Sequence, residues 1–341
     1  MGDQPSASSL MMQQYAINTT ISSGATGRQH GASGKDHVFI FLMFAILLAF
    51  VTIFSNTLVV FAYKVNRRMR NRTIAILVSL AVSDLIVGAV AMPLWMLMTA
   101  SPASMPMSLF KLYMSVDIFS AFASILHLAG VSVERYLAIA SPLRHRAFST
   151  KFYRVMLAGI WFVAAAVAAV FPIQLSYKWD KEYTVFVFVN GFVIPLLVIS
   201  AVYISMFKIA NSSIFPGANQ NASRRFQAEK KLARTGMTLT LLFFFTWCPF
   251  FVVSLIGRFK LLLLNLSPSF VWYITAFVKF LHYSNSALNT FVYAFSSREM
   301  RRTFIWLVCC QSNLAFILMR DDKPRVATRQ RKVEDHSIDS V

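Results

Sequence analysis

Charged residues are scarce in this sequence. Of its 341 residues only 14% are Asp, Glu, Lys or Arg, whereas 57% are hydrophobic. A soluble domain carries about 25% charged residues, so the composition argues against an ordinary water-soluble protein. Because a helix of about 20 apolar residues crosses a bilayer, we expect a multi-pass membrane protein.

Cysteine is also rare. Cys248 lies inside an apolar run, and the adjacent Cys309 and Cys310 precede the C-terminal tail. None falls in a segment expected on the extracellular side, which excludes an extracellular disulfide within the chain. The adjacent pair follows the basic amphipathic stretch SSREMRRTFIWLV, and this position at a membrane surface favours palmitoylation over two idle cytosolic thiols.

Three other features are missing from the sequence. The first 36 residues lack the basic-then-apolar order of a cleaved signal peptide, so the first apolar run is expected to act as an uncleaved anchor. No nucleophile–base arrangement or cluster of metal ligands is visible, which argues against an enzyme. Inverted repeats and broken helices are frequent in transporters and ion pumps. Neither is visible in the sequence, which argues against these two classes.

Seven apolar runs organise the chain. They predict an all-α membrane protein, a seven-transmembrane helix bundle over residues 37–295. Residues 1–36 are polar and are expected to form an extracellular disordered tail. Residues 296–310 are expected to form a short amphipathic membrane-surface helix, and residues 311–341 a cytoplasmic tail. The runs cover 37–65, 72–99, 107–139, 152–175, 183–210, 229–258 and 269–295.

The membrane topology explains why the formal net charge is as high as +19. Basic residues gather in the first, third and fifth connections between the runs and in the C-terminal tail, which all lie on one side of a seven-helix bundle. By the positive-inside rule that side is cytoplasmic and the N-terminus is extracellular. We therefore expect a plasma-membrane protein with the lipid bilayer, and not nucleic acid, as its charged partner.

The third run carries charge near both ends. Asp117 lies near its start, and the triplet 134–136 lies near its end. Eighteen positions separate Asp117 from Arg135, which is five turns or about 27 Å along one helix face. Such a stripe faces a bundle interior or a water-filled cavity, unless Asp117 reaches the lipid headgroups. The stripe continues through Ser120, Ser124 and His127.

Motifs along the whole bundle carry a family resemblance. The segment VERYLAIASPLRHR resembles the third-helix end and second inner loop of rhodopsin-like (class A) G-protein-coupled receptors. The chain is most similar to the biogenic-amine receptors of that family. Landmarks agree in order along the helices: Asn56, Asp84, Pro93, Trp161, Pro195, Tyr203, Phe243, Trp247, Pro249, Asn289 and Tyr293.

The resemblance implies a site for a small cationic amine. Asp117 occupies the position that pairs with the ammonium group of biogenic amines, and Tyr283 matches the tyrosine that hydrogen-bonds this acid. A carboxylate removed from water prefers a cation, and aromatic faces add cation–π attraction. On this view Asp117→Asn weakens amine binding while surface expression survives. The implied site also contains Trp247, Phe250, Phe251 and Ser254.

Two further sites follow from the resemblance. An allosteric sodium ion, unless the cluster is only hydrogen-bonded, is expected at Asp84, Ser124, Asn285, Ser286 and Asn289. The switch that activates heterotrimeric G proteins is expected to comprise Glu134, Arg135, Tyr136, Pro142, Leu143, Tyr203, Glu229 and Tyr293. In that switch Glu229 is the latch for Arg135. Arrestin and receptor kinase are further implied partners, and Asn18 in NTT is the expected glycosylation site.

The chain departs from the family pattern in three places. Phe110 stands where the family has a cysteine bonded to the second outer loop, and Thr290 replaces the proline of the seventh-helix motif. Catechol receptors have serines where this chain has Val187, Phe188 and Gly191. These differences argue against a catecholamine.

Two alternatives within the same fold stay open. A lipid or melanocortin-like peptide receptor fits the short, cysteine-free outer loop, and several acids around the pocket would favour the peptide. An opsin-like photoreceptor needs a lysine at the position of Tyr283, and Lys279 lies one turn away on the same face.

Overall fold

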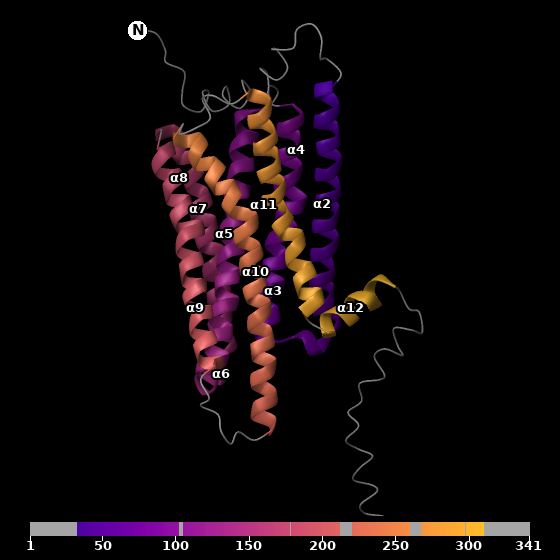
Figure 1. Ribbon diagram of the computed structural model, residues 1–341, viewed down its shortest axis with the longest axis vertical. Coiled ribbons are helices and arrows are strands. Elements are labelled where there is room, and N and C mark those ends of the chain that lie inside the picture. The colour runs from indigo at the N-terminus through magenta and orange to yellow at the C-terminus, as the bar shows by residue number, and fades with distance from the viewer. Residues whose placement is uncertain are drawn as a thin grey trace, which may run out of the picture.

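The structure is a computed structural model that describes residues 33–101, 105–177, 179–211, 220–259, 267–296 and 298–309. The described residues fold as helices arranged in a bundle (Figure 1). The first segment is α2 (Ser33–Val65), and the second is α3 (Arg72–Ile86), η2 (Val87–Ala91) and α4 (Met92–Ala100) in continuous succession. The third is α5 (Met107–Ala140) and the fourth α7 (Thr150–Tyr177).

The remaining segments complete the predicted seven-transmembrane bundle. The fifth is α8 (Asp180–Phe188), η4 (Val189–Val193) and α9 (Ile194–Asn211), the sixth α10 (Gln220–Phe259) and the seventh α11 (Pro268–Ser296). Short elements are η1 (Arg67–Met69), α6 (Pro142–Ala147) and α12 (Arg298–Val308). In Figure 1 α12 bends away from the lower end of α11 and projects outward beyond α2, an orientation that suits an amphipathic surface helix.

Helix boundaries differ from the sequence expectation mainly in α10. That helix begins at Gln220, whereas its apolar run begins at 229, because a polar helical extension carries no hydropathy signal. Six described segments are long and apolar enough to cross a membrane. α11 is as long as the others, but Lys279, His282 and Asn285 lower its hydropathy at mid-helix. These polar groups need partners inside the bundle.

Two prolines explain the π-helical turns. η2 ends two residues before Pro93, and η4 ends two residues before Pro195. A proline has no N–H, and its ring presses on the carbonyl four residues earlier, so a wider turn relieves the helix there. In η4 a Cβ at Gly191 would lie 2.9 Å from the ring of Phe122. Glycine therefore permits the fifth segment to approach α5 closely.

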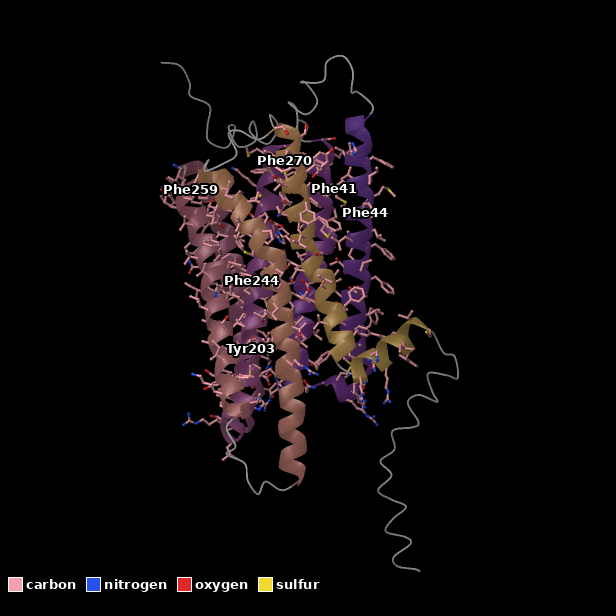
Figure 2. The ribbon with its side chains drawn as sticks, viewed as in Figure 1. Phe41, Phe44, Tyr203, Phe244, Phe259 and Phe270 are labelled. Carbon is pink, nitrogen blue, oxygen red and sulfur yellow. The ribbon has the colours of Figure 1, made fainter. Side chains whose placement is uncertain are left out.

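Apolar side chains divide between the interior and the outer surface of the bundle. Phe41 packs edge-on against Trp95 with ring centroids 5.4 Å apart, whereas Phe44 on the same helix is 58% exposed. Figure 2 labels both residues on α2. An exposed apolar face of this kind suits lipid, which is as apolar as the side chains themselves.

Aromatic packing joins three helices where the family cysteine is missing. Phe110 of α5 is buried against Phe171 of α7, with ring centroids 6.3 Å apart. Phe171 in turn packs against Tyr183 of α8 at 6.1 Å, and the Tyr183 hydroxyl donates to the carbonyl of Val167 at 2.9 Å. α7 and α8 are thus connected at this end without a disulfide.

Candidate ligand site and switch

The polar stripe of α5 lies inside the bundle. α5 contacts α3, α7, α9 and α10, so it is surrounded by other helices. Every polar residue of the expected stripe is buried, from Asp117 to Arg135. His127 at its centre bonds the Ser79 hydroxyl at 2.7 Å, and the Trp161 indole donates to the same hydroxyl at 2.9 Å. His127 is thus satisfied by partners inside the bundle, as buried polar groups require.

Asp117 is neutralised by a lysine of the same chain. The Lys279 ammonium on α11 donates to Oδ2 of Asp117 at 2.6 Å, and both side chains are only 8% exposed. The Tyr283 hydroxyl donates to Oδ1 at 2.9 Å. The predicted partnership of Asp117 with Tyr283 is thus present in the geometry. Lys279 was considered only for the opsin-like alternative, and its ion pair with Asp117 was missed.

The signal that could have found this pair is present in the sequence. Asp117 and Lys279 are opposite charges placed deep in two apolar runs, and each is costly to bury alone. Two such groups satisfy each other at the lowest cost when they meet. Sequence spacing within one helix does not say which face another helix presents to it. The pairing of Asp117 with Lys279 could therefore not be predicted.

Aromatic rings surround the ammonium group. Lys279 Nζ lies 4.6 Å from the ring centroid of Phe250, 4.9 Å from that of Tyr283 and 5.6 Å from that of Tyr113. These distances are within the range of cation–π attraction. We call Tyr113, Phe250 and Tyr283 the aromatic cage. The cage holds a cation in the structure, and that cation belongs to the protein.

Other expected ligand-site residues lie next to the cage. Trp247 packs against His282 with ring centroids 3.7 Å apart, and Phe250 packs against Phe251 at 5.7 Å. Ser254 is half-buried, one turn beyond Phe250 on α10. The Trp247 indole nitrogen has no hydrogen-bond partner among the described residues. Sequence reasoning did not identify His282, which joins this aromatic floor.

The expected sodium cluster is partly assembled. The Asn289 amide donates to Oδ2 of Asp84 at 3.1 Å, and both residues are fully buried. Among the described residues, no partner satisfies Oδ1 of Asp84, the Ser124 hydroxyl or Oδ1 of Asn289. Asn285 instead accepts from the Thr246 hydroxyl at 3.3 Å. These buried oxygens are of the type that a small hard cation prefers as ligands.

Arg135 is held by side chains at the ends of two helices. Its guanidinium donates to both carboxylate oxygens of Glu134, each at 2.5 Å, and also to the Thr73 hydroxyl of α3. Glu134 further accepts from Thr73 at 3.0 Å and lies 2.9 Å from the His145 ring on α6. We call Thr73, Glu134, Arg135 and His145 the inner cluster. It joins the ends of α3, α5 and α6.

Other expected switch residues surround the inner cluster or lie outside the described side chains. The Ser132 hydroxyl, one turn before Arg135, donates to the Tyr203 hydroxyl at 3.1 Å. Figure 2 labels Tyr203 in the lower half of the bundle. Tyr136 is half-buried, and Leu143 is 81% exposed. The side chains that the structure does not describe are those of Pro142, Glu229 and Tyr293.

Sequence comparison identifies the family. The model of the 7 transmembrane receptor (rhodopsin family) matches residues 55–293. The chain belongs to this family of receptors. It is 28% identical over 330 residues to the D(1) dopamine receptor of Carassius auratus, covering 79% of this chain and 87% of that receptor. It is 29% identical over 325 residues to the 5-hydroxytryptamine receptor 4 of Homo sapiens, covering 82% and 81%.

Thr290 gives this receptor a contact that the family proline cannot make. Its hydroxyl donates to Oδ1 of Asn56 on α2 at 3.0 Å. The Asn56 amide donates to the carbonyl of Ser286 at 3.1 Å. Asn56 therefore bridges two turns of α11, which runs as one α-helix through position 290. Ser286 contributes its carbonyl to this bridge.

Aromatic side chains occupy the region where catechol receptors have serines. Phe188 packs against Phe251 with ring centroids 5.6 Å apart, and the Phe192 ring lies 5.0 Å from Phe251. Gly191 is covered closely by Phe122. This apolar surface suits the hydroxyls of a catechol poorly, because burying a polar group without a hydrogen-bond partner costs free energy.

The expected modification sites lie at the periphery of the receptor. Cys309 follows α12 and is exposed. The position of α12 is fixed by the buried Thr303, whose hydroxyl accepts from the Asn66 amide at 2.9 Å. Asn18 and Cys310 lie outside the described residues.

Proposed function

We propose that this receptor binds a small extracellular ligand with an ammonium group at Asp117 and activates heterotrimeric G proteins through the inner cluster. One observation carries the ligand proposal. A buried carboxylate lies in an aromatic cage with a cation already bound to it at 2.6 Å. This arrangement supports an ammonium group as the part of the ligand that binds here. The names of the dopamine and 5-hydroxytryptamine relatives support the same class of ligand.

The acids that contact other side chains inside the described bundle support one ammonium group over a basic peptide. Asp84, Glu134 and Glu299 make their described contacts away from the cage. Asp117 is the acid that contacts the cage residues in the described part of the chain. A peptide with several basic groups would need more carboxylates than this site offers.

An amine screen tests the proposed function. Cells that express the full chain are exposed to ammonium compounds while G-protein activation is recorded. The control is the double variant Asp117→Asn/Lys279→Met, which removes both charges and leaves neither unpaired. We expect at least one compound to activate the unmodified receptor and to fail on the control. Equal responses in both receptors, or none in either, would contradict an ammonium site at Asp117.

We infer that Asp84, Ser124 and Asn289 hold a sodium ion that stabilises the inactive receptor. Their three partnerless oxygens carry this proposal. Physiological sodium should raise the melting temperature of the purified receptor above its value in an equal concentration of potassium, because bound ions stabilise the folded state. Asp84→Asn should abolish that difference. Identical melting in the two salts would leave a hydrogen-bonded cluster without an ion.

The orientation and modifications that we propose follow the distribution of charge. The basic connections and α12 lie on the cytoplasmic side of the plasma membrane, and the N-terminus with Asn18 lies outside, available for glycosylation. Cys309 and Cys310 are proposed palmitoylation sites at the end of α12. Arrestin and receptor kinase are proposed partners of the same cytoplasmic side, and Glu229 is a proposed latch for Arg135.

A further inference from the structure

The ion pair between Asp117 and Lys279 restricts what a ligand of this site must carry. The two groups are 2.6 Å apart and nearly inaccessible, and the Lys279 ammonium lies among aromatic rings. A ligand ammonium that takes Asp117 must first separate the pair. The affinity of the ligand then depends on what happens to the lysine.

A plain amine leaves a buried charge without its partner. If it replaces Lys279 at Asp117, the lysine ammonium remains in the cage without a carboxylate. Loss of one partner from a buried ion pair is costly, about 100-fold or more when expressed as affinity. A plain acid that binds Lys279 has the converse fault, because Asp117 then keeps only the Tyr283 hydroxyl. Neither class satisfies both groups.

We propose that the ligand is a zwitterion, an aromatic amino acid whose ammonium binds Asp117 and whose carboxylate binds Lys279. This inference rests on the proposed ammonium site and adds a second charge to its ligand. Both protein charges keep an opposite charge beside them when such a ligand enters. Each ligand charge likewise finds a partner, so the exchange leaves no group unpaired.

The surroundings of the pair favour an aromatic ligand body. Trp247, Phe250 and Phe251 form a continuous ring surface beside the cage, with neighbouring centroids 5.7 to 6.2 Å apart. Aromatic rings pack favourably against one another in such arrangements. Entry of the ligand would also replace the direct link between α5 and α11 by a bridged one. Binding is thereby coupled to the spacing of two helices.

Matched sets of three compounds test this ligand class. The full receptor is purified, and ligand-dependent melting gives a Kd for tryptophan, tryptamine and indolepropionate. The same is done for phenylalanine, phenethylamine and phenylpropionate. Within each set the aromatic body is constant and only the charges differ. We expect an amino acid to bind about 100-fold or more tightly than both its amine and its acid.

The lysine variants reverse the order if the inference is correct. In Lys279→Met the carboxylate of Asp117 has no internal cation, so the amine should bind more tightly than the amino acid. Lys279→Gln provides the same test if the methionine variant does not fold. Lys181→Met removes an equal charge from an exposed position on α8 and should leave the order unchanged.

The outcomes separate this inference from the proposed function. An amine that equals or exceeds its amino acid on the unmodified receptor overturns the zwitterion and leaves the ammonium site standing. An acid that exceeds its amino acid also overturns it. If no ammonium-bearing probe shifts the melting of the unmodified receptor or of Lys279→Met, both proposals are wrong.

Discussion

Asp117→Asn should lower the stability of the receptor strongly, and adding Lys279→Met should restore most of the loss. The single substitution leaves the Lys279 ammonium buried without its carboxylate, at a cost of about 3–5 kcal/mol. The double substitution removes both charges and leaves neither unpaired, and replacement of a whole buried pair by hydrophobic residues of similar volume is often neutral or stabilising by about 1–4 kcal/mol. Melting temperature and surface expression measure both effects.

A surface pair provides the matched control for this experiment. Arg68 and Glu299 lie 4.0 Å apart with side chains 75% and 47% exposed. Glu299→Gln should change the melting temperature little, because exposed pairs contribute about 0–1 kcal/mol. If the Asp117→Asn/Lys279→Met double variant is as unstable as Asp117→Asn alone, the two residues do not form the buried pair.

This expectation differs from the one drawn from the sequence. Without a partner for Asp117, a neutral amide is cheaper to bury than a carboxylate, so Asp117→Asn was expected to leave expression intact. Lys279 reverses that reasoning, since the carboxylate is the group that stabilises the lysine. Reduced amine binding by Asp117→Asn alone could therefore come either from the loss of the binding carboxylate or from a smaller amount of folded receptor. The double variant separates the two effects.

Hydropathy predicted the seven-helix bundle because the bilayer sets the length of each run. α5 and α11 were expected at 107–139 and 269–295, and the structure has them at Met107–Ala140 and Pro268–Ser296. The polar start of α10 was missed for the converse reason, because a helix outside the membrane needs no apolar run. Family landmarks then located individual residues along each helix.

Contacts between helices were harder to predict than the helices themselves. The depth of Asp117 and Lys279 in their runs could be read from the sequence, but their meeting depends on how α5 and α11 are rotated against each other. The bond from Thr290 to Asn56 depends likewise on the approach of α11 to α2. Arg135 contacts Glu134 and Thr73, whereas the side chain of Glu229, its expected latch, lies outside the described side chains, so that pairing stays a prediction.

Glu134→Gln should raise ligand-independent nucleotide exchange on G proteins about tenfold. Glu134 is 2% exposed and accepts from Arg135 through both carboxylate oxygens. Hydrogen bonds to charged groups contribute about 1.5–3 kcal/mol each, and about 1.4 kcal/mol changes an equilibrium tenfold. Because the amide removes the charge that holds Arg135, the receptor should populate the state in which the inner cluster is open.

Thr73→Val distinguishes release of Arg135 from general damage to this end of the bundle. Valine matches the shape of threonine but removes the hydroxyl that contacts both Glu134 and Arg135. It should raise basal exchange in the same direction as Glu134→Gln, by a smaller factor, since the carboxylate still holds the guanidinium. Exchange is compared at equal surface expression in the same membranes. Basal exchange at the unmodified level in Glu134→Gln would show that the inner cluster does not restrain the receptor, and would leave Glu229 as the remaining proposed latch for Arg135.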